Sequence, residues 1–142
     1  MHLFRHPPED RVRGLLEAAQ LPCDDLTPEH LEHFFGCGPM QAPLGVGGLE
    51  LFGADALLRS LAVEDRARGR GCGTALVDAL ERYARDQGVR RVYLLTTTAA
   101  RFFEGLGYRV ALREAAPEPV RATPEFSVLC PASAIFMTKT LY

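Results

Sequence analysis

The spacing of hydrophobic positions along the 142-residue chain changes several times, and each change predicts a different element. Residues 1–6 predict a short strand. Within residues 12–19 the apolar side chains recur at helical spacing, so we expect a helix that Pro22 ends. Residues 27–33 predict a second, short helix, because Thr27 is a good N-cap and a proline follows it at the first helical position.

The firmest helix of the sequence lies in the middle of the chain. Four apolar residues within 76–83 fall on one face of it, and Gly88 ends it. Short apolar runs rich in β-branched and aromatic residues predict strands around it. These strands are expected over residues 34–40, 44–52, 57–63, 89–98, 108–113 and 133–141. A further short helix is expected over 99–106, ended by Gly107, and residues 117–124 form either a loop or a short helix.

Composition narrows the classes of function. With 142 residues and 47% hydrophobic side chains, the chain can bury a core of its own, so we expect a single domain over residues 1–142. A formal net charge of −2 argues against a broad nucleic-acid surface, which needs a clustered positive excess. The sequence shows neither a charged-then-apolar leader nor a long apolar span, so we expect a cytoplasmic protein with no membrane partner.

Cysteine and histidine spacing suggests no disulfide and no metal site. The cysteines are Cys23, Cys37, Cys72 and Cys130. They lie far apart in a chain that we expect to be cytosolic, so their thiols should be reduced. His30 and His33 lie three residues apart on the second helix, but the spacing suggests no third ligand.

A glycine-rich stretch, RGRGCGT over Arg68–Thr74, follows an apolar strand and opens the central helix. Unpaired backbone N–H groups at such a junction point in the same direction. They lie at the positive end of the helix dipole and so form an anion site. Gly71 and Gly73 leave room for a phosphate to approach these amides, and Arg68 and Arg70 add positive charge at the rim. An ordinary tight strand-helix connection is the alternative.

Two common phosphate-binding motifs do not fit this stretch. A nucleotide P-loop needs a lysine that the loop lacks, and a dinucleotide fingerprint needs a third glycine where Leu76 stands. The fingerprint also needs an acidic residue at the end of the next strand, where residues 96–98 are all threonine.

Two segments resemble the GCN5-related N-acetyltransferases, which use acetyl-CoA. The first is LAVEDRARGRGCGTALV, whose Arg-x-x-Gly-x-Gly core is similar to the pyrophosphate motif of that family. The second is VYLLTTTAARFFEGLGY, which resembles the family's next strand and the helix after it. Both occur in the right order with a helix between them, and the resemblance is clear over residues 44–108.

The resemblance implies an α+β fold with a mixed, mostly antiparallel twisted sheet flanked by helices. Its central strands, 57–63 and 89–98, would run parallel and splay apart, and acetyl-CoA would lie in the split. The first of them would pair with the pantetheine amides of the cofactor, and the loop amides would bind its pyrophosphate. The cofactor-binding residues implied are Leu61, Ala62, Val63, Arg68, Gly69, Arg70, Gly71, Cys72, Gly73, Thr74, Thr98, Phe102 and Phe103.

Within the family, the chain resembles two groups. The segments LLRSLAV and LLTTTAARFFEGLGY are similar to amino-acid N-acetyltransferases, including N-acetylglutamate synthase. The C-terminal RATPEFSVLCPASAIFMTK is closer to small proteins associated with arsenic resistance. Together they suggest a small amino-acid-like acceptor, and a glutamate-like arsenical amino acid would unite both resemblances.

The catalytic prediction includes one departure from the family. Many relatives place a tyrosine, which protonates the leaving thiolate, where this chain has Phe103. The thiolate would then leave without an acid, or a hydroxyl of Thr97, Thr98 or Tyr108 would help. Glu50 interrupts an apolar strand and is the candidate base, acting through water; a solvated strand face is the alternative.

The residues predicted to bind the substrate have less support from a sequence motif than those predicted to bind the cofactor. Arg59 lies in an apolar strand, where it would grip a substrate carboxylate, although it could instead face solvent or a structural acid. The arginine that binds glutamate in the synthase falls near Ser133 here, which leaves that route in doubt. The remaining candidates are Arg121 and Glu125, which could instead form a loop salt bridge, and Cys130, whose thiol would suit a soft metalloid such as trivalent arsenic.

Two other classes of function stay open. The chain could bind acetyl-CoA or a metalloid as a sensor without turnover, or it could acetylate protein N-termini or lysines. Dimers are common in the family, so pairing through the C-terminal strand is a further option.

Overall fold

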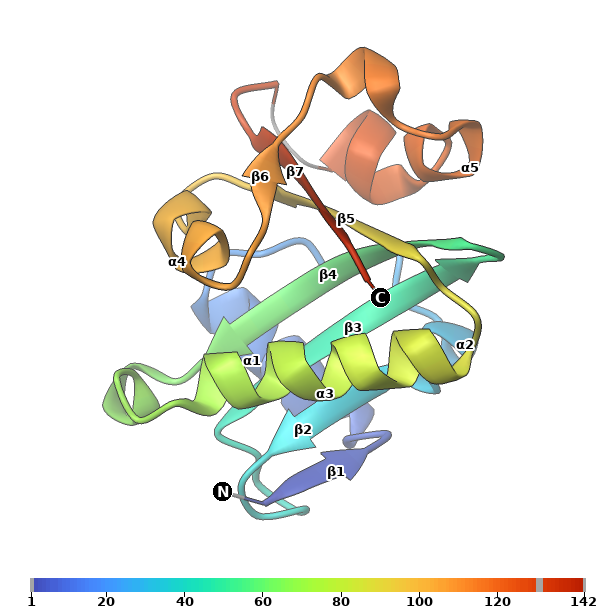
Figure 1. Ribbon diagram of the computed structural model, residues 1–142. Coiled ribbons are helices and arrows are strands. Elements are labelled where there is room, and N and C mark those ends of the chain that lie inside the picture. Colours follow the sequence, from blue (N-terminus) through green and yellow to red (C-terminus); the bar gives the residue numbers. More distant parts are fainter. Residues whose placement is uncertain (1, 130–131, 142) are drawn as a thin grey trace.

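The computed structural model describes residues 2–129 and 132–141 and contains one seven-stranded sheet, in the order β1-β2-β3-β4-β5-β7-β6 (Figure 1). The strands are β1 (Leu3–Arg5), β2 (Phe34–Cys37), β3 (Gly45–Phe52), β4 (Asp55–Val63), β5 (Arg91–Thr96), β6 (Arg109–Val110) and β7 (Ile135–Thr140). Every neighbouring pair is antiparallel except β4 and β5, which are parallel. The predicted α+β fold with a mixed, mostly antiparallel sheet is confirmed.

Five α-helices connect and cover the strands. They are α1 (Glu9–Ala18), α2 (Pro28–Leu31), α3 (Cys72–Asp86), α4 (Ala100–Gly105) and α5 (Glu118–Arg121). The predicted cap of α2 is present, since the Thr27 hydroxyl accepts a hydrogen bond from the N–H of His30. Gly88 and Gly107 adopt positive φ just after α3 and α4, as expected of glycines that end helices.

Two predictions of secondary structure need correction. The strand expected over 108–113 is only two residues long, because the chain leaves the sheet after Ala111 donates to the carbonyl of Phe136 and turns into a 3-10 helix at Arg113–Ala115. A turn of π-helix at Glu125–Leu129 was not predicted.

The sheet separates two apolar layers. Leu58 and Leu94 share a buried cluster with Val77 and Leu80 of α3, the helix that crosses the front of the sheet in Figure 1. Val46 and Ala62 of β3 and β4 instead pack with Val12 and Leu16 of α1, and a third cluster joins Leu57 and Tyr93 to Val120 of α5. Alternation along the strands therefore places α3 on one face of the sheet and α1 and α5 on the other.

A β-bulge interrupts strand β4 at Ser60. Gly48 pairs with Arg59 and Val46 with Ala62, so Ser60 and Leu61 together lie opposite Gly47. Ser60 has a φ of +58°, a left-handed conformation that is uncommon for a non-glycine residue. The extra residue shifts the alternation, so that Leu61 faces the α3 layer and Ala62 the α1 layer.

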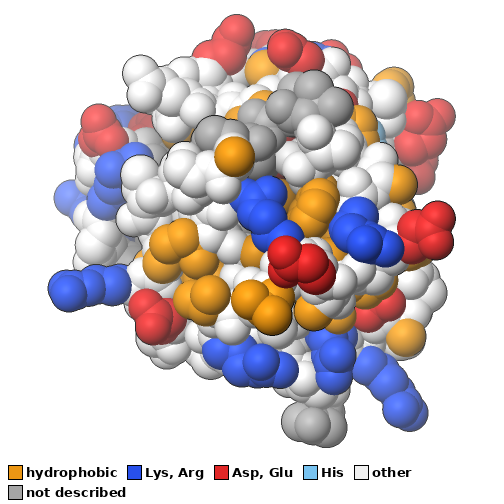
Figure 2. All heavy atoms as spheres, turned by 90° about the horizontal axis from the view of Figure 1, so that it is seen from above, with side chains coloured by type: hydrophobic (Ala, Val, Ile, Leu, Met, Phe, Trp, Pro, Cys, Tyr) orange, Lys and Arg blue, Asp and Glu red, His pale blue; other side chains and the backbone are white. Residues whose placement is uncertain are grey.

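The face of the molecule drawn in Figure 2 does not carry charge of one sign alone. In that view, from above the orientation of Figure 1, acidic and basic side chains are interspersed with apolar ones (Figure 2). Helices long and apolar enough to cross a bilayer are absent from the described part of the chain.

Candidate active site

Strands β4 and β5 separate partway along their length and leave a cleft between them. Their parallel pairing covers only Asp55 to Leu57 on β4, opposite Arg91 to Tyr93 on β5. Beyond this point a cleft of about 550 Å³ lies between residues 58–63 of β4 and residues 94–99 at the end of β5. The facing edge of β4 has no strand partner there, so its backbone groups can pair with an extended ligand.

The glycine loop carries a run of unused backbone donors at one end of this cleft. Gly69 and Gly71 adopt φ values of +77° and +86°, which an L-side chain would strain, and they turn the chain into α3. Within residues 2–129 and 132–141, no backbone or side-chain acceptor is found for the N–H groups of 69–74. Three of these groups belong to the first turn of a fifteen-residue helix, where the helix dipole favours an anion.

A second cleft of about 510 Å³ adjoins the first over this loop. Leu61, Val63, Arg68 and Phe102 line both, so the two form one continuous channel from the glycine loop to the gap between the strands. The loop residues that line the second cleft are Gly69, Gly71, Cys72, Gly73 and Thr74. The predicted cofactor residues are therefore brought together, apart from Arg70, which is exposed nearby and lines neither cleft.

Cys72 contributes packing rather than reactivity to the loop. Its side chain is buried beside Cys37 and Leu76, and a Cβ on Gly45 would lie 2.6 Å from its sulfur. Burial, together with a hydrogen bond to Cys37, raises the pKa of the Cys72 thiol to about 12. The thiol is therefore protonated and a poor nucleophile at neutral pH.

At the other end of the first cleft, Arg59 is surrounded by carboxylates. Its Nη1 donates to Asp25 and, at 2.9 Å, to Glu50; its Nη2 donates to Asp25 at 2.7 Å and lies 2.9 Å from Glu125. Its Nε donates to the Ser60 hydroxyl at 3.0 Å. The Arg59 side chain is only 1% exposed and the three carboxylates 8–10%. Of the alternatives that the sequence left for Arg59, solvent is excluded, because the side chain is buried against three protein acids.

The pKa values in this cluster are set by burial working against the ion pairs. Burial lowers the pKa of the Arg59 guanidinium, but the Asp25 hydrogen bond and the charges of Glu125, Asp25 and Glu50 outweigh it and raise the pKa above its ordinary value. Burial also raises the pKa of the Asp25 carboxyl, yet the hydrogen bond and charge of Arg59 hold it below its ordinary value. Both groups are therefore charged at neutral pH.

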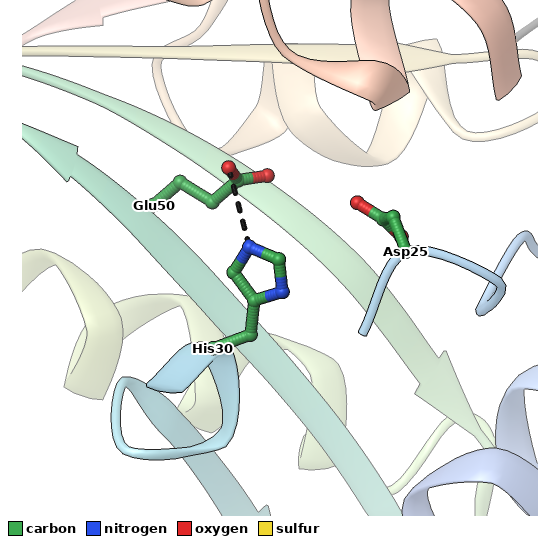
Figure 3. Close-up of side chains that lie close together, drawn as sticks. All are labelled: Asp25, His30 and Glu50. Atoms are coloured by element: carbon green, nitrogen blue, oxygen red, sulfur yellow. Dashed lines mark ion pairs between the residues drawn. The ribbon is translucent and has the colours of Figure 1, made fainter. Parts of the chain in front are cut away.

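His30 joins the cluster from α2 (Figure 3). Its Nε2 lies 3.6 Å from Glu50 Oε1, while its Nδ1 accepts the N–H of Thr27 at 3.1 Å. In the neutral imidazole the proton is therefore on Nε2, which faces the Glu50 carboxylate. His30 and His33 do not form a pair, because His33 instead lies 2.7 Å from the Tyr83 hydroxyl.

Other residues predicted for the site are divided between the cleft and the rest of the molecule. Thr97, Thr98 and Phe103 line the first cleft, as does Glu125. Tyr108 does not: its hydroxyl donates to Glu81 at 3.0 Å, and burial followed by the Glu81 charge raises its pKa, which makes it a weaker acid.

The acceptor-side predictions are also divided. Glu50 touches Arg59 but does not itself line the cleft. Arg121 is exposed on α5, Ser133 is exposed in the turn before β7, and neither lines the two clefts. Cys130 lies outside the described residues.

Sequence reasoning missed Asp25, which makes the most contacts with Arg59. Asp25 lies in an irregular segment between α1 and α2, where no periodicity distinguishes it from its neighbour Asp24. The unusual position of Arg59 in an apolar strand was the available signal that a buried acid must lie nearby.

Comparison with known proteins agrees with this geometry. A family model described as the acetyltransferase (GNAT) family matches residues 3–108, so the chain belongs to that family. An uncharacterised N-acetyltransferase of Chlorobaculum tepidum is 30% identical over 93 residues, which is 65% of this chain and 59% of that protein. The chain spans about half the length of the curated relatives it matches, 50% and 59% for two of them.

Solved structures share the fold. An N-acetylglutamate synthase from Neisseria gonorrhoeae, crystallised with coenzyme A and N-acetyl-glutamate, has a TM-score of 0.83 at 19% identity, covering 99% of this chain and 35% of that one. A Mycobacterium tuberculosis protein crystallised with CoA has a TM-score of 0.80 at 21% identity and full coverage of both chains. At these identities the likeness concerns the fold.

Proposed function

We propose that the chain transfers the acetyl group of acetyl-CoA to the amine of a small acceptor. The observation that carries the proposal is the continuous channel, which begins at the unpaired amides of 69–74 and ends at the charged cluster around Arg59. The amides suit a diphosphate, and the unpaired edge of β4 suits the amide-containing arm of CoA. Family membership and the CoA bound to the similar structures support the same reading.

The residues of the cleft suggest how the reaction proceeds. The amine nitrogen bonds to the acetyl carbon, the carbon-sulfur bond breaks, and one proton of the amine must be accepted by a base. Glu125 lines the cleft, whereas Glu50 lies behind Arg59, so position favours Glu125 as the acceptor of that proton. The assignment of the base to Glu50 stays a prediction.

Protonation of the leaving thiolate has fewer candidates than the sequence suggested. Thr97 and Thr98 lie in the cleft, but the Tyr108 hydroxyl is committed to Glu81. A thiolate has an ordinary pKa of about 8.5 and can leave without a strong acid. We therefore expect no single side chain to be essential for this step.

A small acceptor is favoured over a protein chain. Residues 19–22 after α1 line the first cleft together with Glu125 and Ala134, so segments far apart in sequence enclose it together with β4 and β5. The arsenical amino acid suggested by the sequence stays a prediction, because Cys130 is outside the described residues.

The test is calorimetry with acetyl-CoA and a thiol-release assay across small amines. We expect binding of acetyl-CoA and turnover with at least one amine. Binding without turnover would indicate the sensor alternative, and the absence of binding would overturn the proposal. Glu125→Gln and Glu50→Gln then identify the base, since loss of the base removes the acidic limb of the pH-rate profile of kcat/KM.

A further inference from the structure

We infer that the acceptor end of the cleft selects amines that carry a second cationic group over amines that carry a carboxylate. The inference rests on the proposed acetyl transfer and names the acceptor class for it. It differs from the amino-acid-like acceptor that the family resemblance implies, and the acceptor series decides between the two. Two properties of the cluster around Arg59 support it: the use of its donors and the balance of its charges.

The first property is that Arg59 already faces an oxygen at each of its three nitrogens. Four of its N–H groups donate to Ser60, Asp25 and Glu50, and Nη2 also forms the ion pair with Glu125. A guanidinium has five N–H donors, and a substrate carboxylate is gripped best by two of them in parallel. A carboxylate on the acceptor would therefore have to displace a buried protein carboxylate.

The second property is a surplus of negative charge. Asp25 and Glu50 share the Arg59 guanidinium, so these three groups carry a formal charge of −1 when His30 is neutral. Among the residues that the structure describes, Arg59 is the only Lys or Arg within ion-pair distance of Asp25 or Glu50. Buried charges are costly unless they are compensated, so a cation entering beside this cluster is favoured and a second anion is disfavoured.

The cleft holds little positive charge with which to offset an acceptor carboxylate. Its charged lining residues, within the described parts of the chain, are Arg59, Arg68 and Glu125. Arg68 also lines the second cleft, over the glycine loop, which is the end of the channel proposed to bind the diphosphate. At the acceptor end the Glu125 carboxylate lines the cleft, and the Arg59 guanidinium is already used by protein carboxylates.

A metal ion is a poorer candidate than an ammonium group for a cation that binds beside this cluster. Ligand atoms of Asp25, His30 and Glu50 all lie within 4.8 Å of one another (Figure 3). However, the Arg59 guanidinium already bridges Asp25 and Glu50. A metal also needs the lone pair of Nε2, whereas the Thr27 N–H bonded to Nδ1 leaves the proton on Nε2. Metal binding would thus require loss of that bond of the α2 cap.

The test uses three acceptors that share a four-carbon amine and differ only in the far group: 1,4-diaminobutane, butylamine and 4-aminobutyrate. Leucine and leucinamide test a carboxylate directly beside the amine. We expect kcat/KM to fall in the order diamine, butylamine, aminobutyrate, with about tenfold at each step, and leucinamide to exceed leucine by a similar factor. Calorimetric affinities for the CoA-saturated full chain should follow the same order.

Asp25→Asn, with Asp24→Asn as the matched control, connects this preference to the cluster. The first removes one charge that contacts Arg59, while Asp24 is exposed and makes no ion pair or hydrogen bond with the described residues of the cluster. We expect Asp25→Asn to reduce the diamine-to-aminobutyrate ratio about tenfold and Asp24→Asn to leave it unchanged. Because the ratio compares two acceptors on one variant, partial unfolding cancels.

The outcomes separate this inference from the proposed function. If the diamine binds more tightly than aminobutyrate but nothing is acetylated, the proposed function fails and the charge preference stands. If aminobutyrate is bound and acetylated as well as butylamine, or leucine as well as leucinamide, the preference fails and acetyl transfer stands. Saturable binding of Mn²⁺ alone that Asp25→Asn abolishes would also overturn the inference.

Discussion

The two ends of the channel are built in different ways and would recognise the proposed ligands differently. The cofactor end is built from contiguous backbone: glycines at positive φ and, over residues 69–74, amides for which the described parts of the chain supply no acceptor. The acceptor end is built from side chains of four separate segments, which meet at a buried arginine. Backbone recognition depends on shape that neighbouring residues create, whereas the side-chain cluster depends on the whole fold. The two ends should therefore respond differently to substitution.

The largest effect is expected at the acceptor end, from Arg59→Met. The substitution preserves length but leaves three buried carboxylates without their shared cation. Removing one partner of a buried ion pair costs about 3–5 kcal/mol, so we expect a loss of that size in the free energy of unfolding. Urea denaturation measures it, and Arg121→Met on exposed α5 is the control, expected to stay within about 0.5 kcal/mol. Equal effects of the two would show that the cluster is not structural.

Asp25→Asn should have the next largest effect, and this effect should depend on pH. Asp25 has a pKa below its ordinary value in the folded chain, so its ion pair stabilises the fold above the ordinary carboxyl pKa. That contribution is lost as the pH falls through the lowered folded value. We expect Asp25→Asn to destabilise by about 2 kcal/mol at pH 7, and the difference from the parent to shrink below about pH 4. Urea melts at pH 7, 5 and 3 measure it; a constant difference would contradict the shift.

At the cofactor end, Gly71→Val should weaken acetyl-CoA binding with a smaller effect on folding. A left-handed conformation costs an L-residue about 1–2 kcal/mol, and a branched side chain would also stand where a phosphate approaches. We expect the Kd for acetyl-CoA to rise about tenfold, measured by calorimetry. Gly14→Ala within α1, where a Cβ meets nothing within 4 Å, is the control: it should leave the Kd unchanged and stabilise the fold by about 0.5–1 kcal/mol.

The contrast between the two ends also explains what the sequence could predict. The order of strands and helices followed from periodicity and the glycine loop from a contiguous motif, whereas the parallel, splayed pair was implied by the family resemblance. The loop residues predicted to bind the cofactor could be named together because they are neighbours in the chain, and most of them line the second cleft. Arg59 shows the limit: its partners Asp25 and Glu125 are 34 and 66 positions away, and no local pattern connects them.

Tyr108 shows a related limit, because a sequence motif located the residue but not its hydrogen-bond partner. Its position after α4 suggested that its hydroxyl could reach the thiolate, but side-chain direction depends on tertiary packing. The hydroxyl instead meets Glu81, whose carboxylate also pairs with Lys139 at 3.0 Å on the α3 side of the sheet. A sequence motif thus located the segment but not the direction of the side chain.

Tyr108→Phe should therefore have the smallest effect on catalysis. Because Lys139 still neutralises Glu81 in the variant, only one hydrogen bond is lost, and we expect destabilisation of about 1 kcal/mol. The kcat for acetyl transfer should change less than about twofold, whereas a general acid would contribute at least about a hundredfold. Thr97→Val, in the cleft itself, is the matched variant for a hydroxyl that can reach the thiolate. A large loss of kcat in Tyr108→Phe with intact stability would contradict this expectation. It would mean that the Tyr108 hydroxyl leaves Glu81 during the reaction and reaches the leaving thiolate.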